Sequence, residues 1–144
     1  MIGREQLLAM IPHAGEMCLL DRVVEWDQAS IRCASSRHAA EDNPLRRAGA
    51  LAMVCGVEFA AQAMAVHAAL LAEGAAGKPR AGYLASLRDI TWQQGRLDLI
   101  ADELTVTAQR LMGDEQTALY RFALGAPGRE VLSGRATVVL DAAA

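Results

Sequence analysis

Apolar residues fill one long stretch in the middle of the chain, whereas polar and apolar residues alternate through most of the second half. Residues 48–71 read AGALAMVCGVEFAAQAMAVHAALL. A stretch that is apolar at nearly every position predicts a core helix, because a helix that is apolar on all sides must be buried. We expect this helix from about residue 49 to 73. The glycines and proline of residues 74–79 then end it.

The flanking patterns predict strands. A short helix is expected at residues 4–10, ended by Ile11-Pro12 because a residue before proline avoids helical geometry. Two strands before the long helix and four after it follow from β-branched residues and alternation. Their expected ranges are 18–27, 31–35, 80–92 with a possible bulge, 97–111, 117–124 and 130–140. This order predicts a single α+β domain over residues 1–144, in which an antiparallel β-sheet wraps around one long central α-helix.

Composition narrows the possible functions. The chain has 144 residues, of which 53% are hydrophobic, and its formal net charge is -3. Nucleic-acid binding requires a clustered basic surface, and the sequence has no basic run. Cys18, Cys33 and Cys55 match no zinc or redox spacing, and no metal site is expected. Reduced cysteines and an N-terminus unlike a signal peptide together predict a cytoplasmic protein.

The long apolar stretch also has the length of a membrane span. Glu58, Gln62 and His67 lie within it. An ionised carboxylate near the centre of a bilayer costs roughly 2.5–3.5 kcal/mol or more. We therefore interpret the stretch as the central helix of a globular protein and expect no membrane span.

Glu58 and Gln62 are the main candidates for chemistry, since residues four apart share one face of a helix. A carboxylic acid in apolar surroundings stays protonated near neutral pH and acts as a general acid. Gln62 would orient that carboxyl group or bind substrate, and Gly56 would allow a close backbone approach. The alternative is that Glu58 pairs with an arginine at the surface or at a subunit interface.

The three histidines are expected to have different roles. His67 lies nine residues after Glu58, about half a turn around the helix, and is expected to be structural or interfacial. His38 lies in the polar segment of residues 37–47 and is expected to be solvated. His13 follows Ile11-Pro12, where it is either a catalytic base or a residue that ends the short helix through a backbone hydrogen bond.

Three motifs resemble one enzyme family. Residues 11–24, IPHAGEMCLLDRVV, resemble the opening of hot-dog dehydratases that act on 3-hydroxyacyl groups carried by acyl carrier protein. Residues 56–63, GVEFAAQA, resemble their central-helix Glu-x-x-x-Gln motif, and residues 43–45, NPL, resemble the segment before their active-site loop. The closest resemblance is to the predicted dehydratases of aryl-polyene lipid gene clusters, whose Gly-Tyr-Leu strand matches residues 82–84.

The resemblance implies a hot-dog fold, a lyase activity in fatty acid or polyene biosynthesis, and a site at a dimer interface. It implies His13 and Glu58 as catalytic residues, with Gln62, Gly56 and Tyr83 binding substrate. No cofactor is expected, since the substrate itself carries phosphopantetheine on an acyl carrier protein or coenzyme A. Arg46, Arg47 and Arg80 are expected as docking contacts or, alternatively, as solvated surface arginines. The docking role of the arginines rests on their charge alone, and His13 is the candidate base because a neutral imidazole titrates near the working pH.

The chain departs from the family pattern in one important segment. The usual His-Phe-Pro-Gly-x-Pro sequence before the helix glutamate is absent, and residues 45–58, LRRAGALAMVCGVE, stand in its place without a histidine. Either His13 or His38 takes that role, or the protein no longer dehydrates. Two alternatives follow: an acyl thioesterase that uses Glu58 to activate water, and a catalytically silent hot-dog partner of an active dehydratase. The assembly is expected to be a homodimer or a heterodimer.

Overall fold

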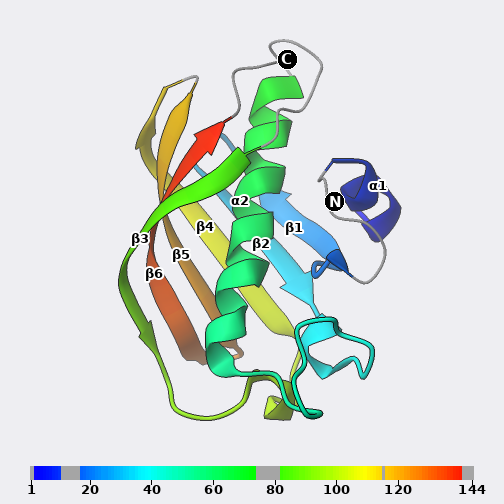
Figure 1. Ribbon diagram of the computed structural model, residues 1–144. Helices are drawn as coiled ribbons and strands as arrows, with labels where there is room; N and C mark the ends of the chain where they lie inside the picture. Colours follow the sequence, from blue (N-terminus) through cyan, green and yellow to red (C-terminus); the bar gives the residue numbers. More distant parts are fainter. Residues whose placement is uncertain (1, 11–16, 74–81, 115, 141–144) are drawn as a thin grey trace.

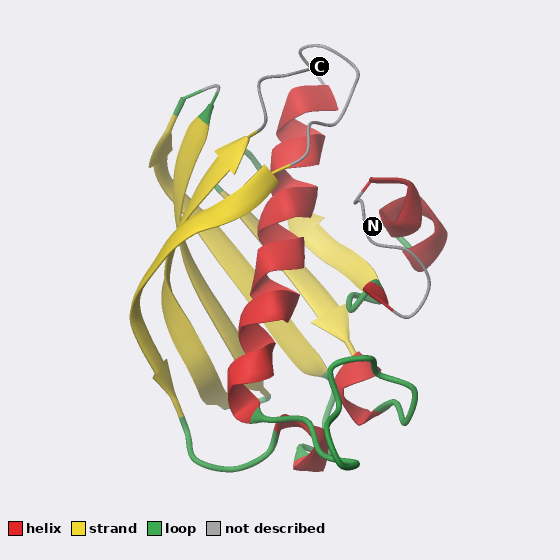
Figure 2. Cartoon of the chain, in the orientation of Figure 1, coloured by secondary structure: helices red, strands yellow, loops and turns green. Residues whose placement is uncertain are grey.

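The computed structural model describes residues 2–10, 17–73, 82–114 and 116–140 of the chain. Six antiparallel strands form one sheet that curls around a single long helix, α2 (Gly56–Glu73) (Figure 1). The strands are β1 (Arg22–Trp26), β2 (Ser30–Ser35), β3 (Gly82–Trp92), β4 (Leu104–Gly113), β5 (Thr117–Ala126) and β6 (Arg129–Leu140). A short helix, α1 (Arg4–Met10), lies to one side of α2 (Figure 2). The predicted α+β architecture is confirmed.

The strand order across the sheet is β1-β2-β4-β5-β6-β3, so β1 and β3 are its edges. The concave face packs on α2 because alternate residues of each strand point inward. In β5 these are Ala118, Tyr120, Phe122 and Leu124, all buried. Phe59, Met64 and Val66 of α2 fill the opposite side of this core. Each such side chain stabilises the fold by roughly 1.5–3 kcal/mol through burial.

The element bounds differ most from the expected ones at three places. The strand expected at 18–27 is shortened to β1, because the backbone of Leu19 bonds to the side chains of Gln62 and Ser35 and not to a neighbouring strand. The strand expected at 97–111 begins only at Leu104, and Leu97–Leu99 forms a 3-10 turn, η4. A further 3-10 turn, η3 (Met53–Cys55), leads directly into α2. Edge strand β3 has two register shifts, which confirms the expected bulge.

The long helix begins later than expected because a tight turn precedes it. Arg47 and Ala50 exchange both backbone hydrogen bonds, at 2.8 and 3.0 Å. The two residues between them, Ala48 and Gly49, have φ angles of 51° and 78°. Positive φ at both central residues is the pattern of a type I′ hairpin turn, which favours glycine or asparagine over alanine.

The stretch Met53–Ala72 is long and apolar enough to cross a membrane by length and composition, and 61% of its most apolar window is buried inside the protein. The sheet supplies that burial, and α2 lies against its concave face (Figure 1). This is the position of the core helix of a soluble protein, as expected from the sequence.

Candidate functional site

Glu58 lies near the beginning of α2, on the side of the helix that faces away from the sheet. Its side chain is exposed in the single chain, and no described residue pairs with it. The same side carries Val54, which is 45% exposed, and the half-buried Ala61, Ala65 and Ala68. The expectation of a buried Glu58 is therefore wrong for the isolated chain. Alanine is apolar but small, so the sequence alone could not show which side of the helix the sheet leaves open.

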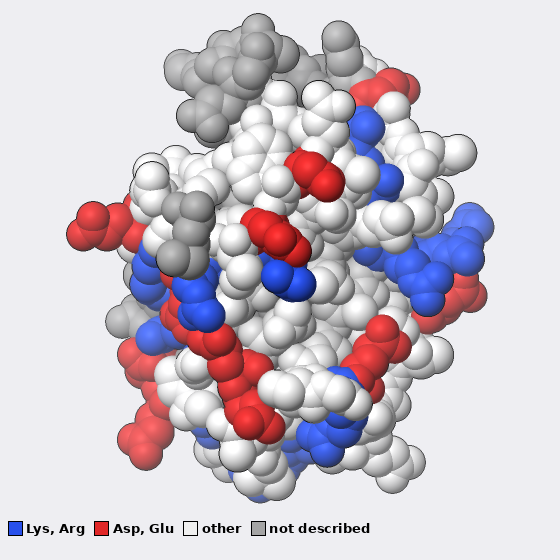
Figure 3. Space-filling model, turned by 180° about the vertical axis from the view of Figure 1, so that it is seen from behind, with Lys and Arg blue, Asp and Glu red and all other residues white. Residues whose placement is uncertain are grey.

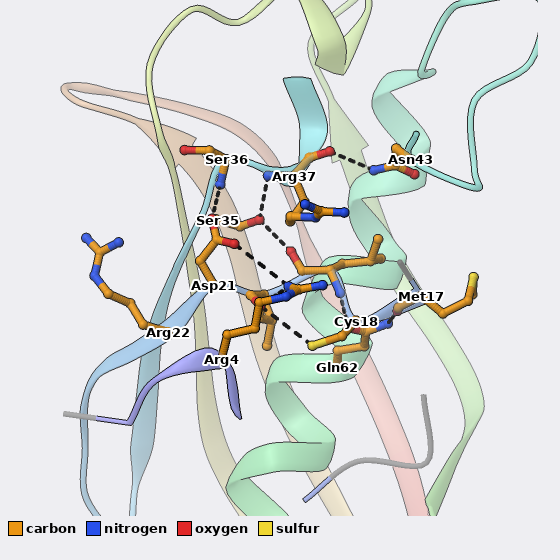
Figure 4. Close-up of polar contacts among 12 residues, drawn as sticks. Arg4, Met17, Cys18, Asp21, Arg22, Ser35, Ser36, Arg37, Asn43 and Gln62 are labelled. Carbon is orange, nitrogen blue, oxygen red and sulfur yellow. Dashed lines mark hydrogen bonds and ion pairs between the residues drawn. The ribbon is translucent and has the colours of Figure 1, made fainter. Parts of the chain in front are cut away.

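Gln62 is fully buried and faces a different direction from Glu58. Its Oε1 accepts a hydrogen bond from the Leu19 N–H at 2.8 Å, and its Nε2 donates to the Met17 carbonyl at 2.6 Å (Figure 4). Glu58 is not among its partners. Gln62 therefore clamps the segment before β1 onto α2. Its substrate-binding role stays a prediction, while its positioning role is visible in the structure.

Gly56 begins α2 on the side that faces the sheet. A Cβ atom there would lie 2.9 Å from Leu132 Cδ2 and 3.0 Å from Leu124 Cδ2, closer than carbon atoms normally approach. The absence of a side chain at Gly56 thus lets the beginning of the helix lie close to β5 and β6, and this confirms the expected close approach. The contacting groups are leucine side chains of the core, and no opening to a substrate is visible on this side. Substrate binding by Gly56 stays a prediction.

Two of the predicted site residues are not placed. His13 belongs to residues 11–16, which lie outside the described residues. The backbone of Tyr83 lies in β3 opposite Val139, but its side chain is outside the described part of the chain. The roles of both residues stay predictions.

His67 is structural, as expected. Its Nε2 donates to the Asp27 carbonyl at 2.7 Å, which leaves Nδ1 to accept from the Tyr120 hydroxyl at 2.6 Å. Both ring nitrogens are therefore used inside the core. Burial lowers the pKa of His67, and burial raises the pKa of Tyr120 to about 12. The neutral imidazole and the protonated phenol match this hydrogen-bond chain.

His38 is buried, so the expectation that it is solvated is wrong. It lies in a 3-10 turn, η2 (Arg37–Ala39), and its Nε2 donates to the Ile100 carbonyl at 2.9 Å. Its Nδ1 is buried and has no hydrogen-bond partner among the described residues. His38 thus holds the loop before α2 to the segment that follows η4.

Asp98 fixes the segment that enters α2. Its Oδ1 accepts from the Leu51 N–H at 2.9 Å, and Arg96 and Arg46 approach its Oδ2 at 2.6 and 3.5 Å. The hydrogen bond from Arg96 is the largest of the effects that lower the pKa of Asp98 to about 2. The ionised carboxylate therefore anchors the beginning of the helix that carries Glu58. Sequence analysis missed Asp98, because the contacts to Leu51 and Arg46 that tie it to the beginning of α2 join residues 47 and 52 positions apart.

The predicted docking arginines have different surroundings. Arg46 donates to the carbonyls of Ala39, Ala40 and Gly49, so it holds its own loop together and is not available at the surface. Arg47 is exposed, and Arg80 lies outside the described residues. Docking through Arg47 and Arg80 stays a prediction.

The residues that carried the family resemblance at 21–22 also have structural roles. Asp21 accepts the Ser36 N–H at 2.7 Å and lies 3.8 Å from Arg4 (Figure 4). Arg22 forms a two-pronged ion pair with Glu103. The Ser35 hydroxyl donates to the Leu19 carbonyl. These contacts fix the corner between α1, β1 and β2. Much of the motif is therefore framework that holds the segment beside α2.

Other groups offer little chemistry. Burial raises the pKa of Cys33 to about 12, so its thiol is unreactive, and Cys18 is buried as well. Within the described residues, no three His, Cys, Asp or Glu side chains gather as metal ligands. Two surface hollows of about 550 and 220 Å³ lie on the sheet, and Glu58 lines neither of them. What Glu58 faces is therefore the open side of the helix.

Known structures share this fold. A dehydratase heterocomplex, ApeI:P from Xenorhabdus doucetiae, contains a chain that is 20% identical, with a TM-score of 0.85 over 95% of this chain and 91% of that chain. A mutant thioesterase from Pseudomonas aeruginosa is 18% identical, with a TM-score of 0.65 over 94% and 91% of the two chains. The zebrafish thioesterase superfamily member 2 is also 18% identical, with a TM-score of 0.65 over 95% and 94%. These likenesses confirm the hot-dog fold.

No curated protein matches the sequence. The family model of the ApeP-like dehydratases, described as ApeP dehydratase, matches residues 5–143. This match covers nearly the whole chain, including the Glu58 segment and the open side of α2. The chain therefore belongs to the ApeP-like dehydratase family and is a dehydratase-like hot-dog protein.

Proposed function

We propose that this chain acts in the dehydration of 3-hydroxyacyl thioesters and that Glu58 is the acid that protonates the departing hydroxyl. The observation that carries the proposal is the placement of Glu58. It is an unpaired carboxylate at the beginning of a helix face that is otherwise built from small apolar residues. A carboxylate in that position makes no contact within the described chain, so it is available to a group from outside. Membership of a dehydratase family supports the same role.

The reaction needs three groups. A base removes the proton from the carbon beside the thioester carbonyl, and donors stabilise the negative charge on the carbonyl oxygen. The bond between the third carbon and its hydroxyl then breaks, and the acid supplies the proton that turns the hydroxyl into water. The products are a 2-enoyl thioester and water. Glu58 would supply the proton, His13 is our candidate for the base, and the N–H groups at the beginning of η3 and α2 would face the carbonyl oxygen.

A second hot-dog subunit would complete this site. The single chain leaves Glu58 exposed, and a second subunit would enclose it in apolar surroundings. Edge strand β3 also has one unpaired side, with Leu87 and Trp92 exposed by 44% and 51%. Unpaired strand edges are sites of pairing with another chain. The subunit would be a copy of this chain or a different one, as in the Xenorhabdus heterocomplex named above.

We further propose the setting of the reaction. The acyl group would arrive on an acyl carrier protein or on coenzyme A, so the phosphopantetheine arm belongs to the substrate and the chain needs no cofactor of its own. The pathway would be aryl-polyene or fatty acid synthesis in the cytoplasm. The resemblance of residues 11–24 and 56–63 supports this setting.

The test compares the chain alone with the chain co-expressed with a hot-dog subunit that carries the His-Phe-Pro-Gly sequence. Formation of the enoyl thioester is followed by its absorbance, and free thiol release is followed in parallel. Glu58→Gln keeps the size of the side chain but removes the acid, so the enoyl product should be lost. Matched variants at Ala61 and Ala65 control for damage to the helix. Unchanged enoyl formation with Glu58→Gln would refute the proposed role of Glu58.

One alternative is favoured by a specific observation. The chain lacks the usual active-site histidine, and Glu58 has no partner in the single chain. A catalytically silent subunit that shapes the site of an active partner would show both features. Turnover that requires the second subunit and survives Glu58→Gln would support this role. Thiol release without enoyl product would instead support the thioesterase alternative.

A further inference from the structure

Three arginines stand directly opposite one another on the outer face of the sheet. Arg121 of β5 is in register with Arg135 of β6, and Arg135 is in register with Arg88 of β3. All three side chains are exposed. Successive residues of a strand point to opposite faces, and the neighbours Tyr120 and Ala136 are buried in the core. The three arginines, called the arginine row below, therefore share the face that points away from α2.

The charges of the arginine row are almost uncompensated. Like charges that face each other across strands destabilise a sheet. Among the described residues, the row has one ion pair, in which Arg135 Nε lies 3.8 Å from a carboxylate oxygen of Asp89. The Asp89 side chain is 73% exposed, so this contact contributes little. Contacts within the described chain do not compensate the repulsion between these three positive charges. A partner with negative charges would compensate it.

A hollow adjoins the row. It has a volume of about 550 Å³, and two members of the row, Arg88 and Arg135, line it. Leu119 gives it apolar surface, and Met112, 66% exposed, contributes to its lining. Ser86, Thr117 and Thr137 add hydroxyl groups, and Asp114 adds one carboxylate, whose Oδ1 already accepts from the N–H groups of Gln116 and Thr117. A hollow of this volume can hold one or two apolar side chains of a partner. Arg88 and Arg135 beside it can bind the partner's carboxylates.

The outer face also shows where positive charge gathers. In the view from behind, one group of blue side chains lies at the right-hand edge, on the side of β3 and β6, with red atoms beside it, and further blue and red groups lie toward the left-hand edge (Figure 3). The positive region is narrow. A narrow row suits a narrow partner, whereas nucleic-acid binding requires a broad basic surface.

The spacing of the row points to a helix. Neighbouring strands lie about 4.8 Å apart, so three successive strands place their charges over about 10 Å. Carboxylates at i, i+4 and i+7 on one face of a helix lie about 5–6 Å apart and extend over two turns, or about 11 Å. We propose that the arginine row and the adjoining hollow form a docking surface for an acidic helix of a partner protein. The helix crosses the strands, with its carboxylates on the arginines and an apolar side chain in the hollow.

Other occupants fit less well. A second copy of this chain is not complementary, because α1 carries Glu5 alone and α2 carries only Glu58 and Glu73, far apart. A small anion such as phosphate would engage Arg88 and Arg135 in the hollow but leaves Arg121 outside its lining. An acidic helix uses all three arginines. The acidic carrier protein of the proposed function is one partner of this kind, and only that identification rests on the proposed function.

The test measures binding without turnover, so it stands whether or not the chain catalyses dehydration. The probe is a conformationally locked helical peptide with glutamates at i, i+4 and i+7 and one leucine beside them. A second peptide of the same composition distributes the glutamates around the helix. Arg121→Gln/Arg135→Gln is compared with Arg32→Gln/Arg129→Gln, which removes the same charge from exposed positions outside the row. Calorimetry at low and at physiological ionic strength gives the dissociation constants.

The first peptide should bind, and the row variant should weaken its binding about tenfold, since two charge-assisted contacts are lost. The control variant should change binding less than about twofold through general charge alone. Equal effects of the two variants, equal binding of the two peptides or no binding would overturn the proposal. Displacement of the peptide by inorganic phosphate at equal concentration would also overturn it, in favour of a small-anion site. Turnover of a coenzyme A thioester should be unchanged in the row variant, which separates a failure of docking from a failure of the proposed reaction.

Discussion

Both sides of α2 are largely apolar, but one side is buried against the sheet and the other is partly exposed. On the inner side, Phe59 and Met64 are buried, and His67 uses both ring nitrogens inside the core. On the outer side, Glu58 has no partner among the described residues, and the alanines that follow it are half-buried. The inner side is complete within one chain, whereas the outer side is complete only with something added. The inner side therefore contributes to stability, and the proposed function uses the opposite side of the same helix.

The largest expected effect is on the outer side. Glu58→Gln should lower the rate of enoyl thioester formation by about 10²–10⁴-fold, because general acid catalysis contributes about that much. The free energy of unfolding should change by less than about 0.5 kcal/mol, since the side chain is exposed. Rate measurements and urea unfolding of the same preparation check both halves. A large loss of stability would show that the two sides are not separable.

The matching change on the inner side is Phe59→Ala. It should lower the free energy of unfolding by about 3–5 kcal/mol, because Phe59 is fully buried and its loss leaves a cavity. Urea unfolding measures the change. Ala61→Ser, two residues further on and half-buried on the outer side, is the control and should have little effect on unfolding.

Gln62 is a polar residue on the inner side, and its variants sharpen the comparison. Gln62→Leu should cost about 2–3 kcal/mol of unfolding free energy, since the Leu19 N–H and the Met17 carbonyl would be left without their partner. Gln62→Glu can accept from Leu19 but, when ionised, cannot donate to Met17. Recovery of full stability at low pH, where the glutamate is protonated, would support the clamp, and identical behaviour of both variants at every pH would contradict it.

The pH dependence of stability reports on His67. Burial lowers its pKa below the ordinary value of 6.5, so the unfolded chain binds a proton that the folded chain rejects. Stability should therefore be full above about pH 6.5 and fall as the pH drops from there toward the lowered pKa. His67→Gln, which does not titrate, should remove this slope from the unfolding free energy even though it lowers stability overall. An unchanged slope would assign the effect to another group.

The smallest expected effect lies in the turn before the helix. Ala48 has a φ angle of 51°, which costs an alanine about 1 kcal/mol, and the next residue is Gly49. Ala48→Asn creates the Asn-Gly sequence preferred in type I′ turns and should raise the unfolding free energy by about 0.5–1 kcal/mol. Ala101→Asn, at an exposed position without a positive φ angle, is the control and should not stabilise the protein.

Hydrophobic pattern was enough to predict most of the fold. The short helix at 4–10 is found with those bounds, and all six strands are present. The bounds were wrong where side chains and not strand neighbours bond the backbone, as at Leu19 with Gln62 and Ser35. They were also wrong at η4, where Asp98 holds the entry to α2. Such contacts join residues far apart in the sequence, so no local pattern indicates them.

For the candidate site, the sequence determined the residue types, and only the tertiary structure decided their surroundings. The Glu-x-x-x-Gln spacing marked both residues, yet the structure turns Gln62 into the core and leaves Glu58 on the open side. A run of alanines gives no signal for which side of a helix the sheet will cover. The register that aligns Arg88, Arg135 and Arg121 is likewise a property of the assembled sheet. The sequence determines which chemical groups are present. The exposure of Glu58 and the alignment of the arginines depend on how distant segments pack against one another.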